Sequence, residues 1–146
     1  MLSYGVYIVT SKVEDDYCGA TVTWVSQASF DPPMISVCIK HDSGSYHVIK
    51  KKGEFLLHLL GDQQKDLAAS FFKTTTIEDR YLNGYEFTLT YNLPLINDVP
   101  AYLHCKVVEI LEHGDHHLFL AEVKDAVVQN DLKPLELRST GWTYGG

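Results

Sequence analysis

Apolar and polar residues alternate with a period of two along much of this chain, which is the pattern of β-strands with one buried face. The alternation, together with runs of β-branched and aromatic residues, predicts strands at 4–11, 19–33, 34–40, 54–60, 85–91, 101–111 and 117–128. Residues 12–16 and 112–116 are expected to form polar turns. Strands that follow one another without a βαβ rhythm predict a mainly β, antiparallel barrel or sandwich. We expect one domain over 1–146.

The expected strand at 19–33 has an unusual polar face. One side carries Ala20, Val22, Trp24, Ala28 and Phe30, and the other carries Thr21, Thr23, Gln27 and Ser29 around Val25. Small neutral donors and acceptors suit an uncharged ligand with many polar groups better than they suit bulk solvent. The alternative is an amphipathic strand whose polar face lies in water. The strand is expected to end at Asp31-Pro32-Pro33, because proline cannot donate to a β-ladder.

Two short helices are expected between the strands. The first follows the turn at 41–45 and ends at Gly53, and the second runs from an N-cap at Asp62 to Phe72. The second helix would bury a stripe of Leu67, Ala68, Phe71 and Phe72. Residues 74–84 show no regular pattern, 94–100 are expected to be a loop between two prolines, and 132–146 contain too few apolar positions for another core strand.

Composition excludes several classes of function. The net charge of −7 argues against a nucleic-acid binder, and no apolar run approaches the roughly 18 residues of a membrane helix. The N-terminal residues lack the pattern of a secretory signal, so a cytoplasmic protein is expected. The three cysteines, Cys18, Cys38 and Cys105, lie in apolar strands, which predicts reduced core thiols.

Motifs restrict the chemistry further. Neither GxGxxG nor GxxxxGK[ST] occurs, so a phosphate would need the helix start near Ser43 and Ser45, for which a plain capped helix is the alternative. The seven histidines form no HExxH motif, and no metal site is expected. His58 is expected to be a core imidazole with satisfied hydrogen bonds. No hydrolytic triad can be located.

Five segments in order resemble the flavin reductase-like, FMN-binding split barrel family. They are GATVTWVSQASFDPP, HDSGSYHVI, GEFLLHLL, DQQKDLAASFF and GDHHLFLAEV. The resemblance implies a split β-barrel, antiparallel and Greek-key-like, with two or so short helices. It also implies a homodimer with flavin near the subunit interface.

The resemblance assigns roles by position. Thr21, Val22, Thr23 and Trp24 would lie against the isoalloxazine, while Ser26, Gln27 and Ser29 would lie near the ribityl chain and phosphate. Ser43 and Ser45 would supply the hydroxyls of the phosphate loop, with His41 and Tyr46 beside them. His116 would lie near the flavin face as the candidate catalytic residue, and Trp142 or Tyr144 would cover the ring or the partner subunit.

These assignments imply an FMN-binding NAD(P)H:flavin oxidoreductase in which NADH or NADPH supplies the electrons. The cofactor carries the hydride chemistry, so binding residues matter more than side-chain acids or bases. One alternative is a flavin-binding electron-transfer module without NAD(P)H turnover. Another is a barrel that has lost flavin binding, since Val22-Thr23-Trp24 replaces the Ala-Asn-Ser of the family pattern.

Overall fold

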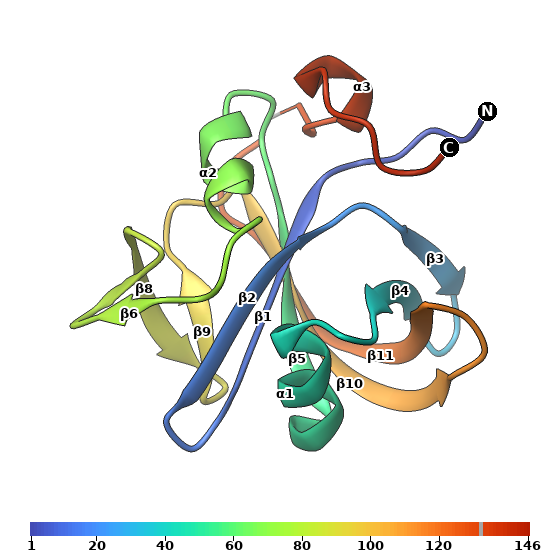
Figure 1. The fold of residues 1–146 in the computed structure, drawn as a ribbon, viewed down its shortest axis with the longest axis horizontal. Coiled ribbons are helices and arrows are strands. Elements are labelled where there is room, and N and C mark those ends of the chain that lie inside the picture. Colours follow the sequence, from blue (N-terminus) through green and yellow to red (C-terminus); the bar gives the residue numbers. More distant parts are fainter. Residues whose placement is uncertain (132) are drawn as a thin grey trace.

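The computed structural model describes residues 1–131 and 133–146 as a mainly β, antiparallel structure, which confirms the predicted fold class (Figure 1). A seven-stranded sheet has the order β2-β1-β5-β10-β11-β4-β3, and a smaller sheet has the order β6-β7-β8-β9. The strands of the large sheet are β1 (Tyr7–Val13), β2 (Asp16–Val22), β3 (Val25–Ser29), β4 (Met34–Lys40), β5 (Glu54–Leu59), β10 (Ala101–Leu111) and β11 (His116–Val128). Those of the small sheet are β6 (Ile77–Glu78), β7 (Tyr81–Leu82), β8 (Tyr85–Thr90) and β9 (Leu93–Ile96). The described helices are α1 (Gly44–Lys52), α2 (Lys65–Ser70) and α3 (Leu137–Thr140).

The two edges of the large sheet are joined by only two residues. β2 and β3 are the edge strands, and Thr23 and Trp24 are all that separates them in the chain. Three Cα–Cα steps span at most about 11 Å, whereas the edges of a flat seven-stranded sheet would lie about 29 Å apart. The sheet must therefore roll until its edges approach each other at this crossing. The result is an open barrel whose mouth is at Thr23-Trp24.

The interior is divided into two apolar clusters, one on each face of the central strands. Val9 and Leu57 belong to the cluster inside the barrel, which α1 closes at one end. Ile8 and Leu56 belong to the second cluster, which the small sheet and α2 cover. Because β1 and β5 are buried on both faces, their sequences are apolar without a clear alternation.

His58 lies on β5 inside this double core and is fully buried. Its Nδ1 is 2.9 Å from the Ile8 carbonyl oxygen, and its Nε2 is 3.1 Å from the Ile96 amide nitrogen. A carbonyl can only accept and an amide N–H can only donate, so the ring is the neutral Nδ1–H tautomer. Burial lowers the pKa of His58 to about 4. The prediction of a satisfied core imidazole is confirmed.

The prediction of a single strand at 19–33 is wrong. The chain forms β2 and β3 at opposite edges, because it crosses the barrel mouth at Thr23-Trp24. The proposed dry face is also interrupted, since Ala28 is exposed and the side chain of Phe30 is 88% exposed.

Other boundaries also differ from expectation. Helix α2 is shorter than predicted, because Gly61 to Gln64 form a turn closed by the Gln64 side chain, and the amide of Asp62 pairs with Lys133 instead of starting a helix. The expected loop at 94–100 begins as strand β9, because left-handed Tyr91 and Asn92 form the hairpin turn from β8. The first strand runs from Tyr7 to Val13 rather than from residue 4 to 11, and β2 begins at Asp16, so the expected turn at 12–16 is confined to residues 14 and 15.

The cysteine prediction is confirmed in that all three thiols are free. Cys18 and Cys105 are buried and Cys38 is half-buried. Burial raises the pKa of Cys18 and of Cys105 to about 12, so these two thiols stay protonated near neutral pH.

Residues 133–146 return across the large sheet next to the N-terminal residues (Figure 1). Leu135 and Leu137 are buried in the second cluster, and isolated bridges tie Glu136 to Gly5 and Pro134 to Gly61. Among the described residues, no helix has the length and apolar character needed to cross a bilayer.

Candidate functional site

A cavity of about 630 Å³ lies at the barrel mouth, beside the crossing between β2 and β3. Its floor comes from the end of β2 and the crossing, one side comes from the end of β4 and from Phe71 and Phe72 just after α2, and its roof comes from residues 141–144. Its lining includes Thr21, Val22, Thr23, Trp24, Cys38, Lys40, Ser43, Phe71, Phe72, His116, Trp142 and Tyr144. A cavity of this size is typical of a small-molecule or cofactor site.

A second hollow, of about 780 Å³, adjoins the first at the N-terminus of α1. Both are lined by Ala20, Ser43, Phe71 and Phe72, and the second also reaches Gly44, Ser45 and Lys51. The first N–H groups of a nine-residue helix therefore face this junction. Helix N-termini attract anions, so the junction is suited to a phosphate group.

Thr23 in the cavity wall is a buried hydroxyl without a partner. The residue is 8% exposed, and no group within 1–131 or 133–146 makes a hydrogen bond to its Oγ1. Native proteins rarely leave a buried hydroxyl unpaired, because its desolvation is then uncompensated. Thr23 is also one of the residues that line the cavity.

The hydroxyls of Thr21 and Ser43 already have structural partners. Thr21 donates to the carbonyl of Ala68 at 2.6 Å and so attaches β2 to α2. Ser43 caps α1: its Oγ accepts from the Tyr46 amide at 3.2 Å and donates to the Lys40 carbonyl at 2.8 Å. The capped-helix alternative is thus present in the structure, and it leaves the amides of Gly44 and Ser45 free of that cap.

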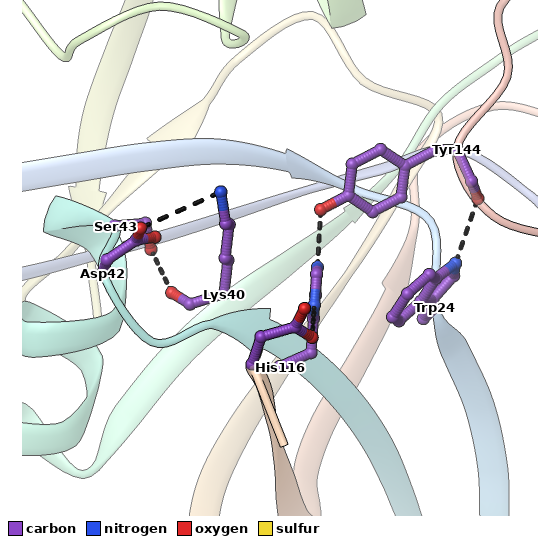
Figure 2. Close-up of polar contacts among 7 residues, drawn as sticks. Trp24, Lys40, Asp42, Ser43, His116 and Tyr144 are labelled. Carbon is purple, nitrogen blue, oxygen red and sulfur yellow. Dashed lines mark hydrogen bonds and ion pairs between the residues drawn. The ribbon is translucent and has the colours of Figure 1, made fainter.

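An aromatic group closes the rim of the cavity opposite the Ser43 loop, and Figure 2 shows both. Trp24 and His116 lie with their ring centroids 4.4 Å apart, and the Tyr144 ring lies 5.3 Å from Trp24. His116 Nδ1 is 2.8 Å from the Asp115 carboxylate, and this hydrogen bond lowers the pKa of Asp115. The candidate catalytic histidine is therefore at the rim, facing the roof segment.

The structure brings most of the predicted site residues together. Thr21, Val22, Thr23, Trp24, Ser43, His116 and Trp142 line the first cavity, and Ser45 lines the second. Their contact with a cofactor stays a prediction.

Five predicted residues lie outside both hollows. Ser26, Gln27 and Ser29 are on edge strand β3, where Ser26 and Gln27 are exposed. The His41 ring stacks on His117 at 5.2 Å, and Tyr46 is 5% exposed with its hydroxyl 2.8 Å from His117 Nδ1. Within this chain, the surroundings of His41 and Tyr46 give both rings structural partners. Their roles toward a ligand stay predictions.

Sequence reasoning missed several residues of the cavity. Lys40 and Cys38 lie at the end of β4, and nothing in their local pattern marks them. Phe72 was expected in the core stripe, but its side chain is 60% exposed and packs against Trp142 with ring centroids 4.8 Å apart. This expectation is wrong because α2 ends at Ser70, so Phe72 leaves the helix at the cavity rim.

No cluster of three or more metal-ligating side chains occurs in the part of the chain that the structure describes. The site is thus defined by neutral hydroxyls, aromatic rings and a helix start. Such a set suits a planar, polyfunctional organic ligand that carries a phosphate.

Comparison with known proteins agrees with this donor set. The family model described as a flavin reductase like domain matches residues 1–142. The chain belongs to this family. The predicted resemblance is therefore confirmed across almost the whole described length.

Named relatives are similar over most of this chain. The reductase component of a 4-nitrophenol 4-monooxygenase/4-nitrocatechol 2-monooxygenase from Rhodococcus opacus is 34% identical over 84% of this chain, which spans 64% of that relative. An NADH-dependent flavin reductase from Pseudomonas fluorescens is 31% identical over 84% of this chain and 71% of its own length. The solved styrene monooxygenase flavin reductase of Pseudomonas putida S12 superimposes with a TM-score of 0.80 at 27% identity, over 95% of this chain and 89% of that one.

Proposed function

We propose that this flavin reductase family member binds FMN in the cavity at the barrel mouth and transfers hydride from NADH or NADPH to flavin. The observation that carries the proposal is the unpartnered Thr23 hydroxyl, in the wall of a cavity that adjoins the start of α1. A flavin presents ring carbonyls and nitrogens that pair with a hydroxyl, and its phosphate matches the helix start. The relatives named as flavin reductases support the same assignment.

The chain's residues would bind and orient the cofactor. Thr23 and the crossing backbone would meet the ring, and the amides of Gly44 and Ser45 would bind the phosphate. Bound flavin supplies the hydride-accepting chemistry, so no side-chain acid or base has to perform it. Trp24 and Trp142 would exclude water from the ring.

We also propose a homodimer. It is supported by edge strand β3, which exposes Ser26, Gln27 and Ala28 together with Phe30 just beyond it. An exposed edge strand beside a large apolar side chain is typical of surfaces that pair with another chain. Sedimentation of the purified protein tests this, with a dimeric mass as the expected result.

The absorbance spectrum of the isolated protein, with and without added FMN, tests flavin binding. We expect bound flavin, and mass analysis of the released cofactor distinguishes FMN from FAD. A protein that stays colourless after incubation with either flavin contradicts the proposal and indicates a barrel without flavin binding. Anaerobic addition of NADH or NADPH should then bleach the bound flavin. Bleaching no faster than in a protein-free flavin control would indicate an electron-transfer module instead.

A further inference from the structure

Residues 141–146 form a strap across the barrel mouth, and we use this name for them below. The strap leaves α3 at Gly141, whose φ of 81° turns the chain over the cavity. Trp142 packs against Phe72 on the far rim, and residues 141–144 form the cavity roof. Anything that enters the cavity from this side must pass the strap.

Tyr144 fastens the strap by two hydrogen bonds, both drawn in Figure 2. Its carbonyl accepts from Trp24 Nε1 at 3.2 Å, and its hydroxyl lies 2.5 Å from His116 Nε2. The next residue, Gly145, packs so closely on the indole that a β-carbon there would lie 2.7 Å from Trp24 Cζ2. The fit of the strap against Trp24 therefore depends on the absence of a side chain at 145.

The closed strap leaves His116 no free nitrogen. Nε2 is held by the Tyr144 hydroxyl and Nδ1 by the Asp115 carboxylate, while the Trp24 ring covers the imidazole at a centroid distance of 4.4 Å. A substrate can contact the imidazole nitrogen at this rim only after Tyr144 has moved. Of the two floor residues in the crossing, Trp24 is bonded to the Tyr144 carbonyl, whereas Thr23 makes no hydrogen bond to the strap.

We propose that Tyr144 is a gate residue, whose hydrogen bond to His116 Nε2 sets how readily a reduced nicotinamide reaches the cavity. This rests on the proposed function, which puts the flavin in the cavity that the strap covers. The apparent affinity for a ligand equals its intrinsic affinity reduced by the fraction of molecules that are open. Weakening the Tyr144 contact should therefore tighten apparent nicotinamide binding.

Steady-state kinetics with saturating FMN test the gate in the full chain. Tyr144→Phe keeps the ring and removes the hydroxyl, and loss of one hydrogen bond should raise the open population and lower the KM for NADH about fivefold. Gly145→Ala should lower KM as well, because its β-carbon displaces the strap from Trp24. Tyr4→Phe is the matched control, since Tyr4 also packs near Trp24 but lies outside the cavity lining.

FMN titration of the same proteins separates this inference from the proposed function. If the parent binds FMN and oxidises NADH, and KM falls in both strap variants but not in Tyr4→Phe, the gate is supported. A KM that is unchanged or higher in Tyr144→Phe overturns the gate while leaving the flavin reductase assignment intact. A parent that binds flavin but never oxidises NADH or NADPH, or that binds no flavin, removes the proposed function and the gate with it.

Discussion

Replacing Thr23 with valine should have opposite effects on stability and on flavin binding. Valine has the shape of threonine without the hydroxyl, so the substitution removes a buried polar atom that has no partner in the described structure. An unpaired buried hydroxyl costs about 1–3 kcal/mol, so the flavin-free Thr23→Val protein should be at least about 1 kcal/mol more stable than the parent. If the hydroxyl pairs with flavin, the same change should weaken FMN binding about fivefold, which corresponds to about 1 kcal/mol.

Thr10→Val is the matched control for this substitution. Thr10 is fully buried, and its hydroxyl donates to the carbonyl of Pro94 at 2.5 Å. Removing that hydroxyl leaves the carbonyl unpaired, so Thr10→Val should destabilise the protein by about 1–3 kcal/mol. The lost hydroxyl has a protein partner in Thr10→Val and none in Thr23→Val. The first variant should therefore be less stable than the parent and the second more stable.

Urea unfolding midpoints measured without flavin, with m-values, give the stability changes, and fluorescence titration with FMN gives the affinities. Two results would refute the reasoning. If Thr23→Val destabilises the flavin-free protein as Thr10→Val does, the Thr23 hydroxyl has a hydrogen-bond partner in the protein and is not available to a ligand. If it stabilises the protein but leaves FMN affinity unchanged, Thr23 is an unsatisfied core residue that takes no part in binding.

Three further predictions concern the core, the crowded glycine and the helix start. Because the unfolded His58 imidazole protonates near pH 6.5 and the buried one only near a pKa of about 4, stability should fall by about 3 kcal/mol as pH drops through this window. A His58→Leu protein should lose this part of the slope, as urea midpoints at several pH values would show. Gly19→Ala should destabilise by about 1–3 kcal/mol, because the new β-carbon would lie 2.6 Å from the Phe71 ring, whereas Gly44→Ala meets open space and thermal melts should show a much smaller change. Ser45→Ala should weaken FMN binding by about 1 kcal/mol, the value of one hydroxyl contact, whereas Ser43→Ala should mainly lower stability because it removes the α1 cap. Unchanged affinity of Ser45→Ala in titration would return that loop to a capped helix alone.

The sequence was sufficient for elements whose burial follows a local period. β4 lies at 34–40 as predicted, because one face of this strand is buried at every second residue. The helix α1 is likewise fixed by local signals, with Ser43 at its start and left-handed Gly53 at its end.

Local pattern failed where a long-range contact decides the outcome. The alternation at 19–33 continues through Thr23 and Trp24, yet the chain changes sheet edge there because the rolled barrel requires it. The sequence predicted that the aromatic residues of the strap cover another part of the protein, because large rings in a coil-like segment are rarely left exposed. It could not predict which residues they contact, because Tyr144 and Trp24 are 120 positions apart in the chain. Cys38 and Lys40 reach the cavity only through the same rolling of the sheet.

A ligand in the cavity would contact Thr23 and Trp24, the two residues that connect edge strands β2 and β3. β2 and β3 are held near each other there by covalent linkage, and the Trp24 carbonyl joins the crossing to β4 by accepting from the Cys38 amide at 3.0 Å. A planar ligand packed against Thr23 and Trp24 would fix the distance between edge strands β2 and β3. Amide hydrogen exchange at the ends of β2 and β3 that flank the crossing should then slow on occupancy.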